Sequence, residues 1–108
     1  METGKILLIP FPFAELNDIK LRPAVVVSTT RDKYNDLILC AISSVVPVKL
    51  SDAEMLLPAN SVNKLRVLSI IKIDRLVTLK RESVVAELGV LSVLEMEQFK
   101  NIFKKLID

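Results

Sequence analysis

Charged side chains gather in the stretch that joins two short apolar runs near the start of the chain. The runs are Ile6–Ile9 and Ala24–Val27, and prolines stand at both ends of the connection between them. The polar residues of this connection are Glu15, Asn17, Asp18, Lys20 and Arg22. A carboxylate can take up a proton, and a guanidinium can grip the oxygens of a phosphate. Loops held by a rigid scaffold often carry function, although the pattern alone favours a plain solvated hairpin loop.

A second pair of opposite charges, Lys72 and Asp74, lies in a strand-like segment. Ile71 and Ile73 alternate with them, so the apolar pair is predicted on one face and the charged pair on the other. A spacing of two residues brings the charges close enough to couple. The alternative is an ordinary ion pair on a solvated strand, which contributes little to stability.

The chain has no histidine and one cysteine, Cys40. A Cys–His nucleophile pair and a histidine metal ligand are therefore excluded, as is an internal disulfide. Cys40 lies in an apolar run, which favours a core position over a nucleophilic role. We expect a cytoplasmic protein without protein-bound metal.

Five segments have the length and composition of β-strands: Ile6–Ile9, Ala24–Val27, Leu37–Ser44, Met55–Pro58 and Arg66–Thr78. Pro10 and Pro12 lack a backbone N–H, so the first strand must end, bulge or run along an edge there. Leu37–Ser44 is apolar with almost no alternation, as expected of a strand covered on both faces. Ser51 and Glu54 could instead cap a short helix before Met55, but a strand is favoured.

Two helices are predicted in the last third of the chain. Glu82–Leu88 contains helix-forming residues and ends at Gly89, a residue that often closes a helix. Farther on, Ser92 and Glu95 form a capping box, with Leu91 and Met96 placed as a hydrophobic staple. An apolar stripe then follows at three- and four-residue spacing: Met96, Phe99, Ile102, Phe103 and Leu106. Short strands with appended helices predict a small β-barrel or curled sheet.

The composition sets limits on size and partners. The 108 residues fit one domain, residues 1–108, and 51% of them are hydrophobic, with a mean hydropathy of +0.44. So much apolar side chain predicts a homo-oligomer. The longest uncharged run, Leu37–Val48, is too short for a membrane span of about 20 residues, and Pro10 and Pro12 rule out a signal peptide. A net charge of +2 is compatible with nucleic-acid binding without requiring it.

Several motifs follow one another along the chain. They are Pro10–Phe13, Lys20–Ser28, Ile38–Ser44, Ser69–Asp74 with Thr78 and Leu79, and Leu88–Ser92. In this order they resemble the MazF/PemK-type toxins of bacterial toxin–antitoxin pairs. The resemblance implies a mostly β (α+β) fold: an SH3-like barrel of the CcdB/PemK type with five or more strands, short helices and a C-terminal α-helix. It also implies a homodimer.

The family cuts single-stranded RNA, typically messenger RNA, at short sequences without a metal or other cofactor. The ribose 2′-hydroxyl attacks the adjacent phosphorus and leaves a 2′,3′-cyclic phosphate and a 5′-hydroxyl. The resemblance implies four catalytic residues. Arg22 would stabilise charge on the phosphate, Ser43 would donate its hydroxyl where relatives have threonine, and Lys72 and Asp74 would act as acid and base.

The remaining site residues are expected to bind RNA: Phe13, Glu15, Asp18, Lys20 and Ser44. Phe13 could stack on a base, although a core position is the commoner fate of such a residue. Glu15 and Asp18 are alternative bases. Two departures from the family pattern stand out: lysine replaces arginine at position 72, and Arg75–Thr78 lacks the arginine that many relatives carry before the threonine.

The resemblance implies a cognate antitoxin as partner, with no membrane and with DNA bound only through the antitoxin complex. Two alternatives share the fold. One is a gyrase-targeting toxin of the CcdB type, but those toxins use a C-terminal tryptophan and this chain has none. The other is a non-catalytic binding module, which the lysine at position 72 and Val77 could indicate.

Overall fold

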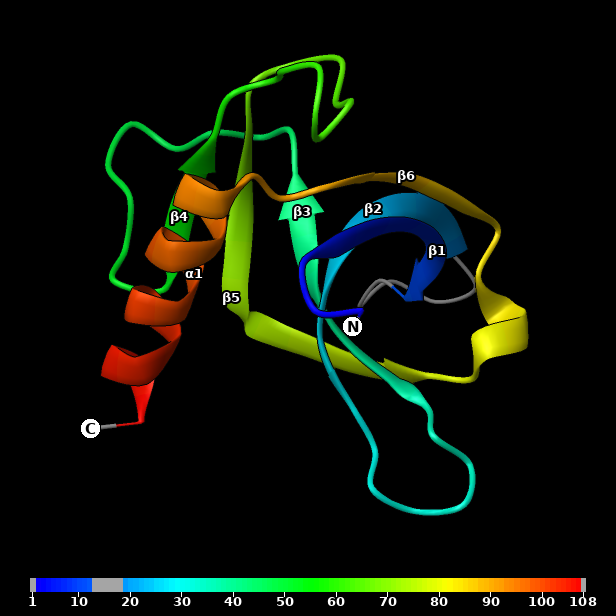
Figure 1. The fold of residues 1–108 in the computed structure, drawn as a ribbon. Helices are drawn as coiled ribbons and strands as arrows, with labels where there is room; N and C mark the ends of the chain where they lie inside the picture. The colour runs from blue at the N-terminus through cyan, green and yellow to red at the C-terminus, as the bar shows by residue number, and fades with distance from the viewer. Residues whose placement is uncertain (1, 13–18, 108) are drawn as a thin grey trace.

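The structure is a computed structural model that describes residues 2–12 and 19–107. Within these ranges six antiparallel strands form one sheet in the order β4-β5-β3-β2-β1-β6, which curls into a half-barrel (Figure 1). The strands are β1 (Lys5–Pro12), β2 (Ile19–Thr29), β3 (Leu37–Ser43), β4 (Glu54–Leu57), β5 (Ser69–Leu79) and β6 (Ala86–Val90). A 3-10 turn, η1 (Arg81–Ser83), precedes β6, and the helix α1 (Val93–Leu106) follows it. The predicted mostly β fold with a C-terminal helix is confirmed.

The first two strands are longer than predicted and form one hairpin. The pairing of β1 with β2 continues through Pro10↔Leu21 to Pro12↔Ile19, so Lys20 and Arg22 lie on a strand and not in the loop. Beyond Leu8, β1 has no partner in β6, which means that both prolines stand on an edge, one of the predicted alternatives. The Leu8 carbonyl accepts from Val85 N–H at 2.9 Å and therefore faces this open side. Pro10 and Pro12 lie two and four residues after Leu8. Because alternate residues of a strand face the same side, the ring nitrogens of both prolines also face this open side.

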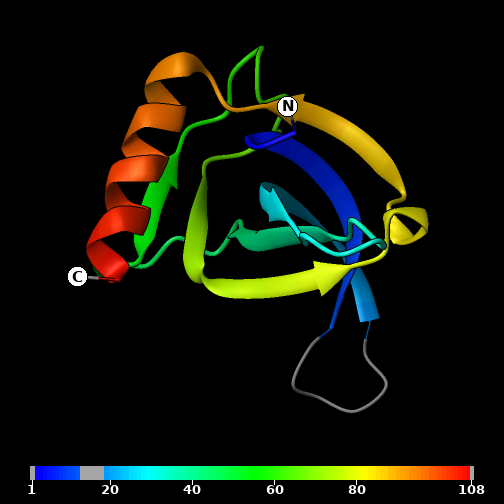
Figure 2. The ribbon, with the colours of Figure 1, turned by 60° about the horizontal axis from the view of Figure 1, so that its bottom comes forward.

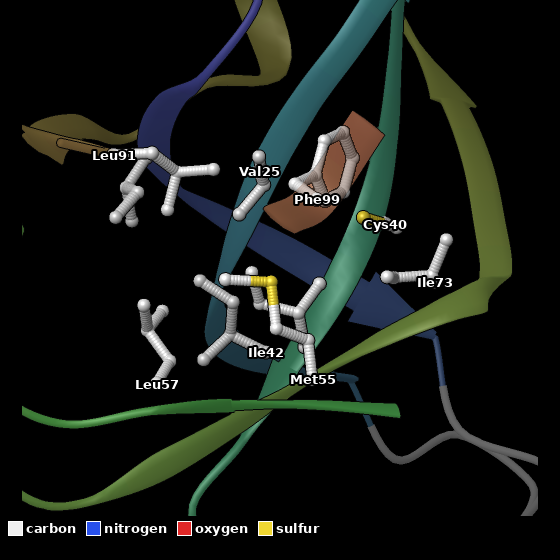
Figure 3. Close-up of a cluster of buried hydrophobic side chains, with 10 residues drawn as sticks. Val25, Cys40, Ile42, Met55, Leu57, Ile73, Leu91 and Phe99 are labelled. Carbon is white, nitrogen blue, oxygen red and sulfur yellow. The ribbon is translucent and has the colours of Figure 1, made fainter. Parts of the chain in front are cut away.

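Both faces of β3 are buried, as predicted. Cys40 and Ile42 belong to one apolar cluster, whereas Leu37 and Leu39 belong to a second cluster on the other face. Figure 3 shows the first cluster, in which side chains from several strands meet Phe99 of α1. Because successive residues of β3 are packed on opposite sides, its position between β2 and β5 is strongly constrained.

The strand alternative for Met55 is confirmed, and the Ser51–Glu54 pattern has another role. Ser51 N–H donates to the Glu54 carboxylate at 2.8 Å, and the Ser51 hydroxyl accepts from Ala53 N–H at 3.2 Å. These are the contacts of a helix cap, but here they close the turn that leads into β4. Met55 and Leu57 then point into the core, with at most 1% of their surface exposed.

The predicted helix over Glu82–Leu88 is wrong. The segment forms only the turn η1 and then strand β6, in which Gly89 pairs with Ile6. Pairing with β1 overrides the local helix preference. Gly89 is needed for another reason: a Cβ atom there would lie 2.5 Å from the Asn63 carbonyl oxygen and 2.6 Å from that of Val62.

The C-terminal helix begins as predicted. The Ser92 hydroxyl accepts from Glu95 N–H at 3.2 Å, and Glu95 accepts from Ser92 N–H at 2.8 Å. Phe99 is 2% exposed, and Met96, Ile102 and Phe103 pack against the same cluster. Figure 2 shows α1 lying alongside β4 at one side of the half-barrel.

An ion pair ties the start of the chain to η1. The Arg81 guanidinium donates to both carboxylate oxygens of Glu2, at 2.6 and 2.8 Å, and its Nε donates to the Asn35 carbonyl at 2.8 Å. The hydrogen bonds from Arg81 lower the pKa of Glu2. The same contact raises the pKa of Arg81.

Replacing Gly89 by alanine is expected to destabilise the protein by about 1–3 kcal/mol, because backbone atoms of residues 62 and 63 would have to move. The measurement is the urea midpoint of unfolding. The control is Glu87→Ala in the same strand, which removes only an exposed contact to Lys5 and should cost less than about 0.5 kcal/mol. Equal midpoints for the two variants would contradict the close approach.

Replacing Glu2 by glutamine should lower stability at neutral pH and have a smaller effect in acid. The folded-state pKa of Glu2 lies below the unfolded one, so the stabilisation is present above the unfolded pKa and is lost as the pH falls through the folded pKa. Urea midpoints of the wild type and the variant should therefore converge as the pH is lowered from 7 to below about 4.3, the usual pKa of a glutamate. A difference that stays constant over this interval would contradict the assignment.

Candidate functional site

A cavity of about 370 Å³ opens where β1, β2 and β3 meet the connection between β4 and β5. Its apolar lining consists of Leu8, Pro23, Ile42, Leu65, Val67 and Leu88. Its polar lining consists of Arg22, Ser44, Lys64, Arg66 and Ser69. The described lining therefore holds three cations and no carboxylate. An anion with an apolar part matches this surface.

Arg22 is placed in the cavity by the β1–β2 hairpin. It pairs with Ile9, which is fully buried, and Pro23 after it holds the backbone extended. The side chain is half-buried. Arg22 is thus an anchored residue of the cavity lining, and a guanidinium can bind two oxygens of a phosphate at once.

Ser43 and Ser44 stand where β3 ends. Ser44 is exposed and lines the cavity. The Ser43 oxygen accepts from Val45 N–H at 3.1 Å, which orients the oxygen, and no described residue accepts its hydrogen. Ala24 of β2 pairs with Ala41 of β3. Arg22 lies two residues before Ala24 and Ser43 lies two residues after Ala41, so Arg22 and Ser43 occupy the same end of the β2–β3 ladder.

Lys72 and Asp74 come from β5 and are not among the described lining residues. Lys72 is half-buried between Ala41 of β3 and Glu54 of β4. Ser43 pairs with Ile70, and Lys72 lies two residues after Ile70 on the same strand. Lys72 and Ser43 are therefore diagonal neighbours, which typically lie about 7–8 Å apart. Asp74 is exposed in the stretch 73–75, which interrupts the β3–β5 pairing where β5 bends.

Of the other expected RNA contacts, the structure describes only Lys20 and Ser44. Lys20 is exposed on β2 opposite Phe11. Phe13, Glu15 and Asp18 lie outside the described residues. The structure therefore brings Arg22 and Ser44 to one cavity with Ser43 beside them, and it places Lys72 and Asp74 along the neighbouring strand.

Sequence reasoning missed Lys64 and Arg66, which line the cavity from the β4–β5 connection. Arg66 was expected only as the first residue of the strand Arg66–Thr78, which in the structure begins at Ser69, and Lys64 was expected in the connection before that strand. Lys64 has φ 57°, a left-handed conformation that is uncommon for residues other than glycine. The signal available in the sequence is a pair of basic residues directly after two asparagines, Asn60 and Asn63.

Cys40 has no part in this site. It is fully buried on β3, and burial raises the pKa of its thiol to about 12. The thiol therefore stays protonated at neutral pH and is a poor nucleophile. This agrees with its prediction as a core residue.

The described residues, 2–12 and 19–107, also bear on metals and membranes. They contain no group of three or more acidic or cysteine side chains that could hold a metal ion together. None of their helices is long and apolar enough to cross a bilayer.

Known proteins share this architecture. The family model for PemK-like, MazF-like toxins of type II toxin–antitoxin systems matches residues 2–107. The chain belongs to this family. The resemblance inferred from the sequence motifs is thereby confirmed. No curated protein sequence matches the toxin significantly.

Two solved toxin structures illustrate the shared fold. The Mycobacterium tuberculosis toxin MazF-mt6 superposes with a TM-score of 0.74 at 16% identity, over 96% of each chain. An endoribonuclease from a mycobacterial species, solved in complex with its cognate antitoxin, superposes with a TM-score of 0.73 at 13% identity, over 97% of this chain and 92% of that one. At these identities the likeness concerns the fold.

Proposed function

We propose that this toxin is a metal-independent endoribonuclease that cleaves single-stranded messenger RNA in the cytoplasm. The observation that carries the proposal is the meeting of Arg22 and Ser44 in one cavity, beside Ser43, in a member of a toxin family. A neighbour in fold is itself described as an endoribonuclease. A phosphodiester needs a cation for its oxygens and hydroxyl donors close by, and these residues supply both.

The proposed reaction uses the RNA's own ribose as nucleophile. A base removes the proton from a 2′-hydroxyl, and the oxygen forms a bond to the adjacent phosphorus. The bond from phosphorus to the 5′-oxygen breaks, and an acid protonates that oxygen, leaving a 2′,3′-cyclic phosphate and a 5′-hydroxyl end. The extra negative charge on phosphorus is stabilised by Arg22 and by the Ser43 hydroxyl, since donors aimed at developing charge lower the barrier.

The proton transfers must be made without histidine. Asp74 as base and Lys72 as acid are one assignment, and their positions on β5 put Lys72 close to Ser43 along the sheet. Glu15 or Asp18 of the β1–β2 connection is the other choice for the base. RNA entering from the hairpin side would also meet Lys20, and Phe13 stays a candidate for stacking on a base.

We further propose that the toxin forms a homodimer and that a cognate antitoxin blocks the cavity. Exposed apolar side chains are available for such contacts, including Val93 and Leu94 on α1, which are 81% and 77% exposed. An acidic antitoxin segment would compete with RNA for the cations of the cavity. DNA would then be bound only through the antitoxin.

Replacing Arg22 by alanine is expected to reduce RNA cleavage by at least about 10²-fold, because the main cation for the phosphate is lost. The measurement is the labelling of new 5′-hydroxyl ends in a mixed RNA pool, in the presence of a chelator. Arg31→Ala, which removes an exposed arginine from the β2–β3 turn, is the matched control and should cleave like the wild type.

The oligomeric state of Arg22→Ala should be that of the wild type by sedimentation. Undiminished cleavage by this variant would refute the role of Arg22. A wild-type toxin that stops growth but leaves RNA whole would favour a protein target such as gyrase, and a protein with neither effect would be a binding module.

Substitutions at Ser43 test the hydroxyl directly. Ser43→Ala should lower the cleavage rate by about 10-fold or more, whereas Ser43→Thr, which keeps the hydroxyl, should retain most of it. Rates are compared under single-turnover conditions. A slow threonine variant together with a fast alanine variant would exclude the hydroxyl as donor.

A further inference from the structure

We propose that Lys64 and Arg66 form a phosphate-binding subsite for the RNA chain, separate from the phosphate that Arg22 would hold at the point of cleavage. The inference rests on the proposed ribonuclease function. Both residues line the same cavity as Arg22, but they reach it from the β4–β5 connection on its other wall. An RNA strand lying in the cavity would therefore meet cations on two sides.

The connection presents these two cations by partly burying the residue between them. Leu65 packs against the main apolar cluster, while its neighbours Lys64 and Arg66 are both exposed. The left-handed backbone of Lys64 persists only because the surrounding contacts hold it there. The pair is thus fixed in direction by an apolar anchor and a backbone turn.

A buried asparagine holds that turn. Asn63 is fully buried; its side-chain nitrogen donates to the Pro58 carbonyl at 2.9 Å, and its side-chain oxygen accepts from Leu65 N–H at 3.0 Å. The same oxygen accepts from Asn60 N–H at 3.1 Å. These contacts fix both ends of the segment that precedes Lys64.

Two neighbouring elements stabilise the turn from outside. The Asn60 side chain donates to the Glu95 carboxylate at 3.0 Å, so the capped start of α1 is joined to the connection. On the other side Gly89 lets β6 approach closely, and Val90 N–H donates to the Val62 carbonyl at 3.2 Å. A site held by this many contacts needs little ordering when a ligand arrives.

The charges of the pair are open to a ligand. Neither Lys64 nor Arg66 makes an ion pair with another described residue, and no described carboxylate lines the cavity. Apolar residues of the same cavity lining, such as Leu8 and Val67, offer a surface for the uncharged part of a nucleotide. Alternating phosphates and bases fit this arrangement, so we assign the subsite to RNA.

The test measures how strongly RNA binding depends on salt. The probe is a mixed-sequence pool of single-stranded 2′-fluoro RNA, which lacks the attacking hydroxyl and stays whole. Each cation that contacts a phosphate contributes about 0.7 to the slope of log Kd against log salt for a single strand. The double variant Lys64→Asn/Arg66→Gln should therefore lose about 1.4 from the wild-type slope. Asparagine at position 64 tolerates the left-handed backbone.

The matched control is Lys104→Gln/Lys105→Gln, which removes the same charge from the last turn of α1, at the opposite end of the helix from Glu95. Its slope should equal that of the wild type. Circular dichroism checks that each variant is folded. If the double variant unfolds, the single variant Arg66→Gln replaces it, and its slope of log Kd against log salt should be about 0.7 smaller than that of the wild type. An unchanged slope in the folded variant, or an equal loss in the control, would overturn the subsite.

The outcomes separate this inference from the proposed function. A wild type that cleaves no RNA but shows the expected slopes would refute the ribonuclease and leave an RNA-binding subsite. A wild type that cleaves RNA while the double variant keeps its slope would retain the ribonuclease and refute the subsite. If the double variant loses binding of a polyglutamate peptide but keeps the wild-type slope for RNA, the pair would be assigned to a protein partner. That result would also refute the RNA subsite.

Discussion

The burial of β2 and β3 on both faces is the constraint from which the rest of the structure follows. Val25, Cys40 and Ile42 fill one side of these strands, and Ala24, Val26 and Leu39 fill the other. A shift of one residue would exchange the two sets and disturb both clusters. The ends of the strands are thereby fixed relative to one another, which places Arg22 and Ser43 at the same end of the ladder.

The second requirement is a firm wall opposite those strand ends, and polar contacts provide it. The segment before Lys64 lacks regular secondary structure, but a fully buried asparagine satisfies its backbone groups. Because a buried polar group without a partner is costly, the contacts of Asn63 specify one conformation. Paired strands with buried faces order the strand side of the cavity, whereas the side-chain hydrogen bonds of Asn63, together with the packing of Leu65, order the loop side.

The elements that could be predicted from the sequence are those with local signals. The apolar run around Cys40 marked a strand covered on both faces, and Ser92 with Glu95 marked the start of the helix. Glu82–Leu88 was misread because pairing with β1 and the approach of residues 62 and 63 to Gly89 depend on residues distant in sequence. Lys64 and Arg66 were missed for the same reason, since only the folded chain brings them to Arg22, whose own importance came from the family motif.

The prolines of β1 limit how other chains can approach the sheet. Beyond Leu8 this strand has no neighbour in β6, and the ring nitrogens of Pro10 and Pro12 occupy the positions from which amide groups would otherwise donate on that side. An incoming extended peptide would find carbonyl acceptors there without the alternate donors that a ladder needs. The open half of β1 is therefore a poor template for aggregation and for extending the sheet by a further strand.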